Sequence, residues 1–392
     1  MNTLNSLAVK VTIRNKNGLV TRVLTNSAVD GVVDQSDYFE REIVTQSNID
    51  NYLVIDEGDF VYNPRISSSA PVGPISKNNI GRGIMSPLYT IFRFNNSQND
   101  FYEQYFKTNL WNGYLKTVSN TGARHDRISI SVDKFMEMPL PSSSDKEQQK
   151  IADCLTSLDG LITAEDKKLS TLRAHKKGLM QKLFPAEGKT VPEWRFPEFR
   201  DSSEWQSNTI RNTCDSYSGG TPVTSNKEYY GGKIPFIRSG EIDKKVTELY
   251  LTEEGLKNSS AKMVAVGDVL VALYGANSGE VALSKMSGAI NQAILCLKHE
   301  SNNAFAYHYL CHKKQWIIKT YIQGGQGNLS GEIIKSVELC FPKLPEEQQK
   351  IADCLSDLDT LITAQAEKTE VLKAHKNGLM QGLFPSIEEV EE

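Results

Sequence analysis

The chain carries one long helix-forming segment twice. Residues 147–185 align without a gap to residues 347–385, and 27 of the 39 aligned positions are identical. Both copies open with the letters EQQKIADCL. Solenoid repeats are much shorter, at roughly 20 to 50 residues from one unit to the next. The repeat therefore indicates two large halves, each of which ends in the same element.

Each copy follows an unbroken heptad pattern with steps of four and three. The seam positions of the first copy are Ile151, Leu155, Leu158, Ile162, Glu165, Leu169, Leu172, Lys176, Leu179 and Leu183. Those of the second are Ile351, Leu355, Leu358, Ile362, Gln365, Thr369, Leu372, Lys376, Leu379 and Leu383. So narrow a stripe predicts a long helix that needs a partner with the same stripe, and each copy is the obvious partner of the other. Ordinary long core helices are the alternative that periodicity alone leaves open.

Both ends of the predicted helices carry sequence signals. Ser144-x-x-Glu147 fits a capping box, and Pro345 fits the first turn of the second helix. Phe-Pro at 184–185 and 384–385 predicts where the helices stop. At about 1.5 Å per residue, each helix would be roughly 55 Å long.

A pseudo-twofold axis across the pair would set the two helices antiparallel. The polar seam residues Glu165, Gln365 and Thr369 would then lie near the middle, where polar residues fix the register at some cost in stability. Cys154 and Cys354 would lie at opposite ends, so we expect no disulfide between them.

The two copies share residues outside the heptad seam, at positions expected to be exposed, as well as residues within the seam. Packing does not require identical exposed residues, so the recurrence predicts that both copies meet the same kind of partner and that the chain binds two copies of it. The expected partner-binding residues are Gln148, Gln149, Lys150, His175 and Gln181, and Gln348, Gln349, Lys350, His375 and Gln381.

Each helix follows about 140 residues of a different texture, in which short β-rich runs alternate with turn clusters. Both segments contain a Gly-Asp turn, at 58–59 and 267–268, and then an aromatic helix-like stretch. We expect an α+β protein with one domain fold used twice and two diverged surfaces. The expected boundaries are a first domain at 1–144, a conserved helix at 145–185, a linker at 186–206, a second domain at 207–343, a second conserved helix at 344–385 and an acidic tail at 386–392.

The net charge of −4 first argues against a nucleic-acid partner, for which a basic patch is usual. Counted by segment, residues 1–144 carry 14 basic and 14 acidic side chains, and residues 207–343 carry 15 and 12. The tail SIEEVEE alone contributes −4. Both domains are therefore free to carry local basic faces.

The sequence also limits compartment and redox state. The six cysteines form no CxxC pair, which disfavours a disulfide scaffold or a zinc ribbon. The N-terminal residues lack an apolar signal region, and no uncharged stretch of about 18 apolar residues occurs. We expect a cytoplasmic protein with reduced thiols and no membrane association.

These features resemble the DNA-specificity subunits of type I restriction–modification systems over essentially the whole chain. The resemblance is carried by the two EQQKIADCL…LFP regions, the PEWRFPEF linker (192–199) and the phrases FVYNPRISSSAPVGP (60–74), IPFIRSGEI (234–242) and GDVLVALYG (267–275). It implies two target-recognition domains, joined by two long antiparallel coiled-coil helices with pseudo-twofold symmetry. Each domain would read one half of a bipartite, asymmetric sequence in double-stranded DNA.

The resemblance also implies partners and cofactors. Family members bind two modification subunits, which use S-adenosylmethionine to methylate adenine, and through them the ATP-dependent restriction subunits. No cofactor is expected on this chain, and the subunit itself would be non-catalytic. One departure is that the first domain starts almost at residue 1, with little of the lead-in that precedes the second.

Catalytic and metal motifs are weak or missing in the sequence. An Asn/Asp-Pro-Pro-aromatic methyltransferase motif is absent, and Asn63-Pro64-Arg65 is the nearest fragment. No GxxxxGK[ST] phosphate loop occurs. His308-x-x-Cys311-His312 has no evident fourth ligand, so we expect it to pack a helix and expect no metal site. A coiled-coil scaffold without DNA binding and a stand-alone DNA methyltransferase remain the alternatives.

Base reading calls for forked or amide donors on loops, because Arg pairs with guanine and Asn or Gln pairs with adenine. Glycines beside the candidates allow close approach of the backbone. The candidates in the first domain are Arg65, Ser67, Lys77, Arg82, Arg124, His125 and Arg127. Those in the second domain are Arg238, Tyr274, Asn277, Lys285, Asn291, Gln292, Gln326 and Asn328.

Overall fold

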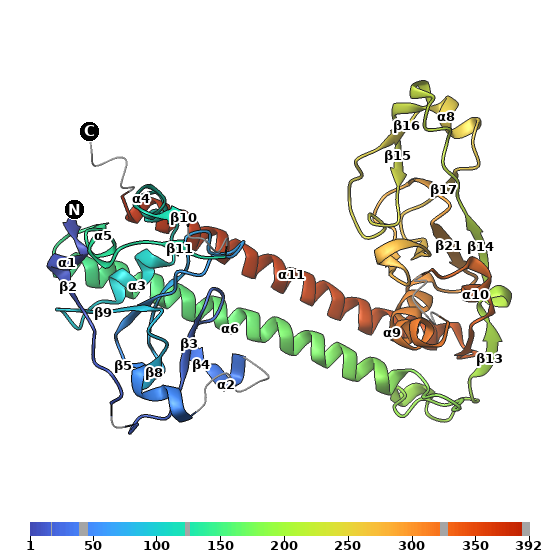
Figure 1. Cartoon of the computed structure of the whole chain (residues 1–392). Helices are drawn as coiled ribbons and strands as arrows, with labels where there is room; N and C mark the ends of the chain where they lie inside the picture. The colour runs from blue at the N-terminus through green and yellow to red at the C-terminus, as the bar shows by residue number, and fades with distance from the viewer. Residues whose placement is uncertain (17, 39–45, 122–125, 322–327, 386–392) are drawn as a thin grey trace. The chain divides into compact units, whose positions relative to one another are not determined.

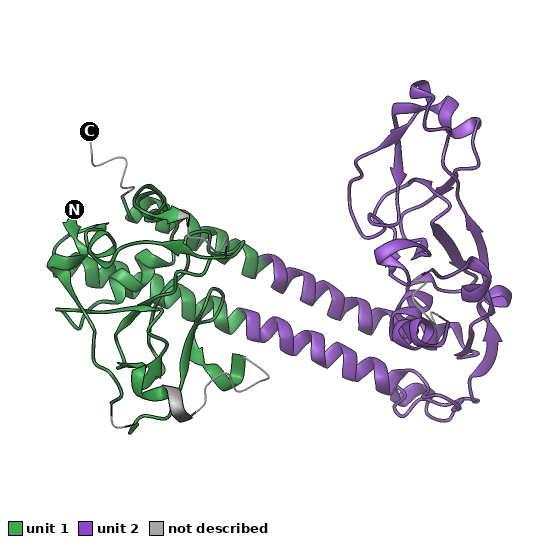
Figure 2. Cartoon of the chain, in the orientation of Figure 1, with its two compact units in different colours: residues 1–165, 368–392 green, residues 166–367 purple. Residues whose placement is uncertain are grey.

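The computed structural model describes residues 1–16, 18–38, 46–121, 126–321 and 328–385. The chain divides into two compact units (Figure 2): unit 1 is Met1–Glu165 with Lys368–Glu392, and unit 2 is Asp166–Glu367. Each unit combines one β-rich domain with a part of both long helices. The boundary between the units therefore falls within the helices, and we describe each unit by itself.

The two repeat segments form the helices α6 (Asp145–Leu183) and α11 (Pro345–Leu383), each 39 residues long (Figure 1). The amide of Glu147 donates to the Ser144 hydroxyl at 3.3 Å, and Pro345 is the first residue of α11. Both helices end one residue before the Phe-Pro pairs. These observations confirm the predicted starts and stops.

Within each unit the paired parts of α6 and α11 run antiparallel. In unit 1, Lys376 pairs with Asp159, and Lys368 lies 2.5 Å from Glu165, so positions rise along one helix as they fall along the other. In unit 2, Lys176 lies 2.5 Å from Asp359. Lys176 and Lys376 occupy corresponding seam positions, and Asp359 and Asp159 occupy corresponding positions on the facing helices. Each lysine is thus neutralised by the equivalent aspartate of the other copy.

The polar seam residues of the second copy are buried, as the heptad pattern predicts. Gln365 in unit 2 is 6% exposed, and Thr369 in unit 1 is 1% exposed. Cys154 belongs to unit 1 and Cys354 to unit 2, and both are free thiols.

Unit 1 holds the first domain. Its main antiparallel sheet has the order β2 (Ala8–Lys10), β9 (Thr90–Phe94), β6 (Phe60–Tyr62), β7 (Ile75–Lys77). Smaller antiparallel pairs are β1 (Asn2–Thr3) with β12 (Pro139–Leu140), β3 (Leu24–Ser27) with β4 (Gly31–Asp34), β5 (Leu53–Ile55) with β8 (Gly83–Met85), and β10 (Asn120–Thr121) with β11 (Ile128–Ser129). The short helices are α1 (Leu4–Leu7), α2 (Gln35–Tyr38), η1 (Gln46–Asn51), α3 (Asp100–Phe106), α4 (Asn112–Val118) and α5 (Val132–Met136).

Unit 2 holds the second domain. Its main antiparallel sheet has the order β14 (Cys214–Ser218), β21 (Ile294–His299), β18 (Val269–Ala272), β19 (Val281–Leu283). A second sheet has the order β16 (Tyr250–Leu251), β15 (Tyr230–Ile237), β20 (Gly288–Ile290), β17 (Lys262–Val264), and β13 (Gln206–Thr209) pairs with β22 (Glu338–Phe341). The remaining elements are η2 (Pro197–Phe199), α7 (Ile210–Thr213), η3 (Lys227–Tyr229), α8 (Glu253–Lys257), η4 (Gly275–Asn277), α9 (Asn303–Tyr321) and α10 (Gly331–Ser336).

The two domains share one topology, as the sequence predicts. In the two main sheets, β2, β9, β6 and β7 of the first domain occupy the same places in the strand order as β14, β21, β18 and β19 of the second. The Gly-Asp turns also match, because Gly58 and Gly267 have φ values of +86° and +89°, where glycine is favoured. Asp59 accepts the Asp56 amide at 2.9 Å, and Asp268 accepts the Ala265 amide at 2.8 Å.

Each domain core includes the C-terminal end of one long helix. In unit 1 the ring of Phe384 lies 5.2 Å from that of Phe101 and 5.6 Å from that of Tyr105. In unit 2 Phe184 meets the corresponding pair, at 5.7 Å from Phe305 and 4.4 Å from Tyr309. The structure is therefore α+β, with two β-rich domains and long helices packed together. Within the described ranges, no helix is long and apolar enough to cross a membrane.

Candidate nucleic-acid interface

Two candidate arginines from distant segments lie side by side in the first domain. Arg65 follows β6, Arg127 precedes β11, and their backbones form an isolated antiparallel bridge. The carboxylate of Asp126 lies 3.6 Å from the Arg65 guanidinium and 3.9 Å from that of Arg127. The two arginine side chains are 58% and 31% exposed. One acid facing two arginines leaves excess positive charge on a loop, as recognition of phosphate or guanine requires.

The other candidates of the first domain differ in how available they are. Arg82 is 64% exposed and lies 3.6 Å from Asp56, and Ser67 is exposed. Lys77 is only 11% exposed and pairs with Asp100 and Glu103, so its charge is neutralised within the domain. Arg124 and His125 lie outside the described residues.

In the second domain, several candidates meet at the loop that follows β18. The amide of Gly275 donates to Asn328 Oδ1 at 3.3 Å, which joins this loop to the segment before α10. Tyr274 is 41% exposed, and Asn277 is also exposed. The loop therefore presents an aromatic ring and amide groups together. Gln326 lies outside the described residues.

A second group of candidates follows β20. The Thr221 hydroxyl donates to Gln292 Oε1 at 2.6 Å, so the Gln292 amide nitrogen keeps its donors for another partner. Asn291 Oδ1 accepts a hydrogen bond from the backbone amide of Ala293 at 3.1 Å. The side-chain amide nitrogen of Asn291 therefore also keeps its donors for another partner. Lys285, before this strand, is exposed.

Arg238 has a structural role that the sequence analysis did not anticipate. Its guanidinium hydrogen-bonds to Glu241 and Glu248. Burial opposes ionisation of Glu241, but hydrogen bonds from Arg238 and backbone amides outweigh it and lower the pKa of Glu241 to about 2. Arg238 is therefore held as a cation by two carboxylates, and its capacity for an additional base contact is smaller than that of Arg65.

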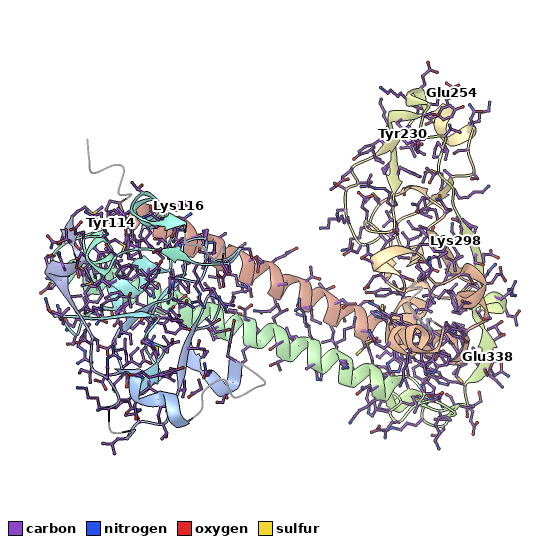
Figure 3. The ribbon with its side chains drawn as sticks, viewed as in Figure 1. Tyr114, Lys116, Tyr230, Glu254, Lys298 and Glu338 are labelled. Atoms are coloured by element: carbon purple, nitrogen blue, oxygen red, sulfur yellow. The ribbon has the colours of Figure 1, made fainter. Side chains whose placement is uncertain are left out.

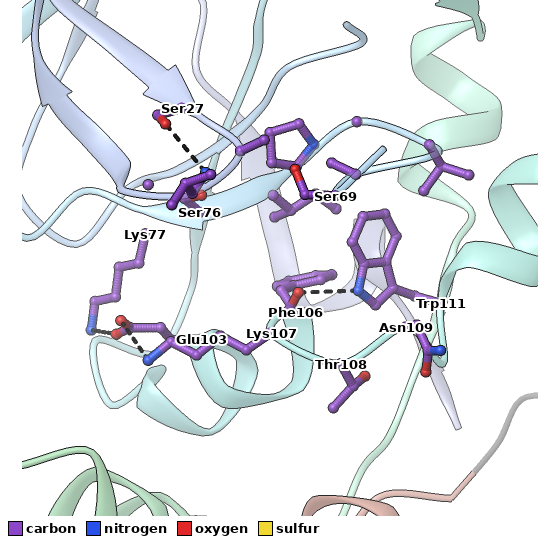
Figure 4. A pocket seen from close by; sticks show the side chains of 18 of the residues that line it. Ser27, Ser69, Ser76, Lys77, Glu103, Phe106, Lys107, Thr108, Asn109 and Trp111 are labelled. Atoms are coloured by element: carbon purple, nitrogen blue, oxygen red, sulfur yellow. Dashed lines mark hydrogen bonds and ion pairs between the residues drawn. The ribbon is translucent and has the colours of Figure 1, made fainter. Parts of the chain in front are cut away.

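The first domain also has a cavity of about 790 Å³ (Figure 4). It is lined by the β3–β4 turn, the segment before β7, the α3–α4 connection and the residues Asn377, Met380 and Gln381 of α11. Trp111 is fixed at its wall by an indole hydrogen bond to the Phe106 carbonyl at 3.2 Å. The candidate Lys77 and the expected partner-binding residue Gln381 border the same hollow.

The expected partner-binding residues fall into two groups. His175, Gln181, His375 and Gln381 are exposed near the ends of the two helices. Gln149 and Gln349 make matching bonds at the other ends, to Asp153 at 2.7 Å and to Asp353 at 2.6 Å. Lys150 is exposed, whereas Lys350 lies 3.4 Å from Glu198.

The expectation that Gln148 and Gln348 are exposed is wrong. They are 9% and 5% exposed. Gln148 donates to the Ser143 carbonyl at 3.0 Å, and Gln348 donates to the Pro342 carbonyl at 3.1 Å. Their recurrence therefore has a structural cause, because both fasten the chain segment that enters the helix.

His308 and Cys311 pack the inner side of α9, as the sequence predicts. His308 is fully buried, and its Nε2 lies 3.0 Å from the Ser356 hydroxyl. Burial, assisted by the charge of Lys176, lowers the pKa of His308 to about 3. The described residues contain no group of three His, Cys, Asp or Glu side chains that could hold a metal ion.

Replacing His308 by glutamine is expected to flatten the acid side of the stability curve. The folded state keeps His308 neutral down to about pH 3, whereas the unfolded chain protonates it near 6.5. The contribution of neutral His308 to the free energy of unfolding is therefore complete above about pH 6.5. It declines as the pH falls toward 3, by about 1.4 kcal/mol per pH unit for one proton. Gln104 occupies the matching position in unit 1 and donates to Asp159 at 3.2 Å, so glutamine suits the site.

Urea unfolding between pH 4 and 7 measures this effect. The exposed His175→Gln variant is the matched control and should follow the parent. If the unfolding free energies of His308→Gln and of the parent changed in parallel across this pH range, the lowered pKa of His308 would be contradicted.

Sequence reasoning missed a buried cluster between the linker and α11. Arg195 donates to both carboxylate oxygens of Glu347, at 2.8 and 2.6 Å, and Trp205 donates its indole N–H to the same group at 3.2 Å. The two side chains of the ion pair are 5% and 2% exposed. The PEWRFPEF phrase was the available signal, but its partner lies 152 residues away. Lys116 of α4 is an exposed basic residue of the first domain (Figure 3).

Comparison with known proteins adds independent findings. The family described as "Type I restriction modification DNA specificity domain" matches residues 202–374. The type I restriction enzyme MjaIX specificity subunit of Methanocaldococcus jannaschii is 30% identical over 47% of this chain and 45% of its own length. The putative MjaX specificity subunit of the same organism is 26% identical over 69% of this chain and 63% of its own length. The chain thus matches about half to two thirds of these relatives.

A solved structure shares the fold along nearly the whole chain. The S subunit of a type I restriction-modification system from M. genitalium superimposes with a TM-score of 0.66 at 14% identity, over 98% of this chain and 96% of that one. The shared topology, the matching domain and the relatives lead to one conclusion. Residues 202–374 match the DNA specificity domain of type I restriction–modification systems, and the chain is similar to specificity subunits of such systems.

Proposed function

We propose that the chain is the non-catalytic, sequence-reading subunit of a type I restriction–modification complex. The observation that carries the proposal is one domain topology used twice with different loop residues, on two nearly identical helices. Each domain reads one half of a bipartite, asymmetric target in double-stranded DNA. The Arg65–Arg127 pair serves the first half, and the loop around Tyr274 and Asn328 serves the second.

The repeated helices support the second part of the proposal, which concerns protein partners. Their exposed recurring residues dock two modification subunits, through which the restriction subunits join the complex. S-adenosylmethionine and ATP are bound by those partners and used there. The contribution of this chain is to position the partners on DNA that it has selected.

DNA binding by the purified chain should depend steeply on salt. Each phosphate contact releases condensed counterions, so the logarithm of the association constant falls with the logarithm of salt concentration by about 0.9 per contact. Fluorescence anisotropy with labelled duplexes between 50 and 300 mM KCl measures the slope. A scaffold that does not touch DNA would show no duplex affinity at any salt concentration. Binding of S-adenosylmethionine by the chain alone would instead support a stand-alone methyltransferase.

Changing the exposed residues of one helix copy should remove one of two modification subunits. The variant His175→Glu with Gln181→Glu, and the variant His375→Glu with Gln381→Glu, should each retain a single partner because the two sites are separate. The combined fourfold variant should retain none. Native mass spectrometry of the reconstituted complex counts the subunits, and Lys168→Glu, on the exposed side of α6, is the control. Loss of both partners from either double variant would contradict two independent sites.

A further inference from the structure

Two asparagine side chains of the second domain use their oxygen within the domain, and among the described residues their nitrogen has no hydrogen-bond partner. The oxygen of Asn291, which is half-buried, accepts the backbone amide of Ala293 at 3.1 Å. The oxygen of Asn328, which is exposed, accepts the backbone amide of Gly275 at 3.3 Å. A backbone N–H group can only donate, so the side-chain atoms that face Ala293 and Gly275 are the oxygens. The N–H groups of both asparagines are therefore left to bind a ligand.

Gln292 is oriented in the same way by a closely packed segment. The Thr221 hydroxyl donates to Gln292 Oε1 at 2.6 Å. Two residues before Thr221, a Cβ at Gly219 would overlap the carbonyl of Ile290, so glycine is needed for this close approach. The amide of Gly220 donates to the same carbonyl at 3.2 Å. The Gln292 side chain is exposed, and within the described ranges its nitrogen has no partner.

Backbone hydrogen bonds bring the three amides to one edge of the domain. β18 and β21 run antiparallel, so the chain that leaves β18 lies beside the chain that enters β21. The amide of Leu273 donates to the Ala293 carbonyl at 2.8 Å, and the amide of Leu329 donates to the Leu273 carbonyl at 2.9 Å. The segments that carry the three amides are therefore neighbours. We call these amides the donor edge, which consists of Asn291, Gln292 and Asn328.

The donor edge has more free donors than free acceptors. Each free amide nitrogen carries two N–H donors, whereas each bound oxygen keeps at most one lone pair. The usual pairing of asparagine or glutamine with adenine uses both ends of one amide, since the oxygen accepts from N6 and the nitrogen donates to N7. Free N–H donors match base atoms that accept, which in the major groove are N7 and O6 of guanine, N7 of adenine and O4 of thymine.

We propose that the donor edge reads the second half-site through the hydrogen-bond acceptors of the bases and makes no contact with the amino groups of adenine or cytosine. The inference rests on the proposed function, because it concerns how the second domain reads DNA. It replaces the pairing with adenine that the residue types alone suggest for these three amides. Guanine presents N7 and O6 side by side, so it offers two acceptors to a single amide nitrogen.

Changes of single atoms in the DNA test the proposal on the full chain. Methylation mapping first gives the target, and fluorescence anisotropy then measures the binding of labelled duplexes that carry it. Replacing a contacted guanine or adenine of the second half-site by its 7-deaza analogue removes N7 and should weaken binding by about five- to tenfold. Replacing the adenine by purine, which lacks the N6 amino group, should leave the affinity unchanged. The same analogues placed in the spacer are the matched control.

Reversing the polarity of one amide provides the complementary test. Asn291→Asp keeps an oxygen that accepts the Ala293 amide and replaces the free donor by an acceptor. This variant should bind the parent duplex more weakly and should lose its sensitivity to the 7-deaza analogue at the contacted base. Asn226→Asp is the matched control, because Asn226 Oδ1 accepts the Glu228 amide at 3.1 Å outside the donor edge. It adds the same charge to the domain and should keep the sensitivity of the parent.

Two results would overturn the inference and leave the proposed function standing. Weaker binding with purine in place of adenine, at a position where the 7-deaza analogue also weakens it, would mean that the amides pair with adenine through both ends. A loss of affinity in Asn291→Asp without any effect of the 7-deaza analogues on the parent would mean that the donor edge contacts phosphates. Absence of affinity for every duplex would instead contradict the proposed function, and the inference with it.

Discussion

Arg127→Ala is expected to weaken recognition of one half of the DNA target by about tenfold to a hundredfold and to leave the other half unchanged. A bidentate arginine contact with guanine is worth about 1–3 kcal/mol of discrimination against other bases. Arg127 shares Asp126 with Arg65, so the alanine variant removes one of two cations from this loop. Arg65→Ala should act on the same half-site, and the double variant should lose more than either single variant.

Methylation mapping of DNA from cells that carry the complete system is the measurement. It gives the target of the parent first and then the positions that each variant no longer distinguishes. Lys134→Ala provides the control, because this exposed lysine of the same domain pairs with Glu137, the residue that caps the C-terminus of its helix. Equal relaxation of both half-sites would contradict separate reading by the two domains. A uniform loss without relaxed positions would mean that Arg127 contacts only phosphate.

The sequence predicts the long helices well because their signals are local. Each signal acts within one or two turns: the heptad seam, the Ser144 cap, Pro345 and the Phe-Pro stops. The structure confirms the helix starts and ends that these signals predict. The partners of the seam lysines could not be predicted in the same way. Asp159 and Asp359 meet Lys376 and Lys176 only through the antiparallel register, which depends on the packing of both helices.

The candidate site is less predictable because it depends on residues that are distant in sequence. Lys77 looks like a free loop cation, but the fold brings Asp100 and Glu103 to it. Gln148 looks like a surface residue of a helix start, but the entering chain folds over it. Conversely, Arg65 and Arg127 were separate candidates, and the isolated backbone bridge between them places them together.

Breaking the Arg195–Glu347 pair is expected to have the largest effect on stability in the molecule. Removing one partner of a buried ion pair leaves an uncompensated charge and typically costs about 3–5 kcal/mol. Arg195→Ala would leave the Glu347 carboxylate buried with only the Trp205 indole as a donor. Glu347→Gln would leave the Arg195 guanidinium with the carbonyls of Ser202 and Ser203. Both variants should therefore destabilise unit 2.

Urea unfolding followed by tryptophan fluorescence is suited to this test, since three of the four tryptophans, Trp194, Trp205 and Trp316, belong to unit 2. The matched control is Glu147→Gln, the same change at the corresponding helix position. Because Glu147 is exposed and unpaired within the described part of unit 1, its replacement should change the unfolding free energy by no more than about 0.5 kcal/mol. Identical residues at identical helix positions would then differ by several kcal/mol, because only Glu347 is covered by Arg195 and Trp205 of the linker segment. Equal effects of the two glutamine variants would mean that the contacts of Arg195 and Trp205 with Glu347 contribute nothing specific to the stability of unit 2.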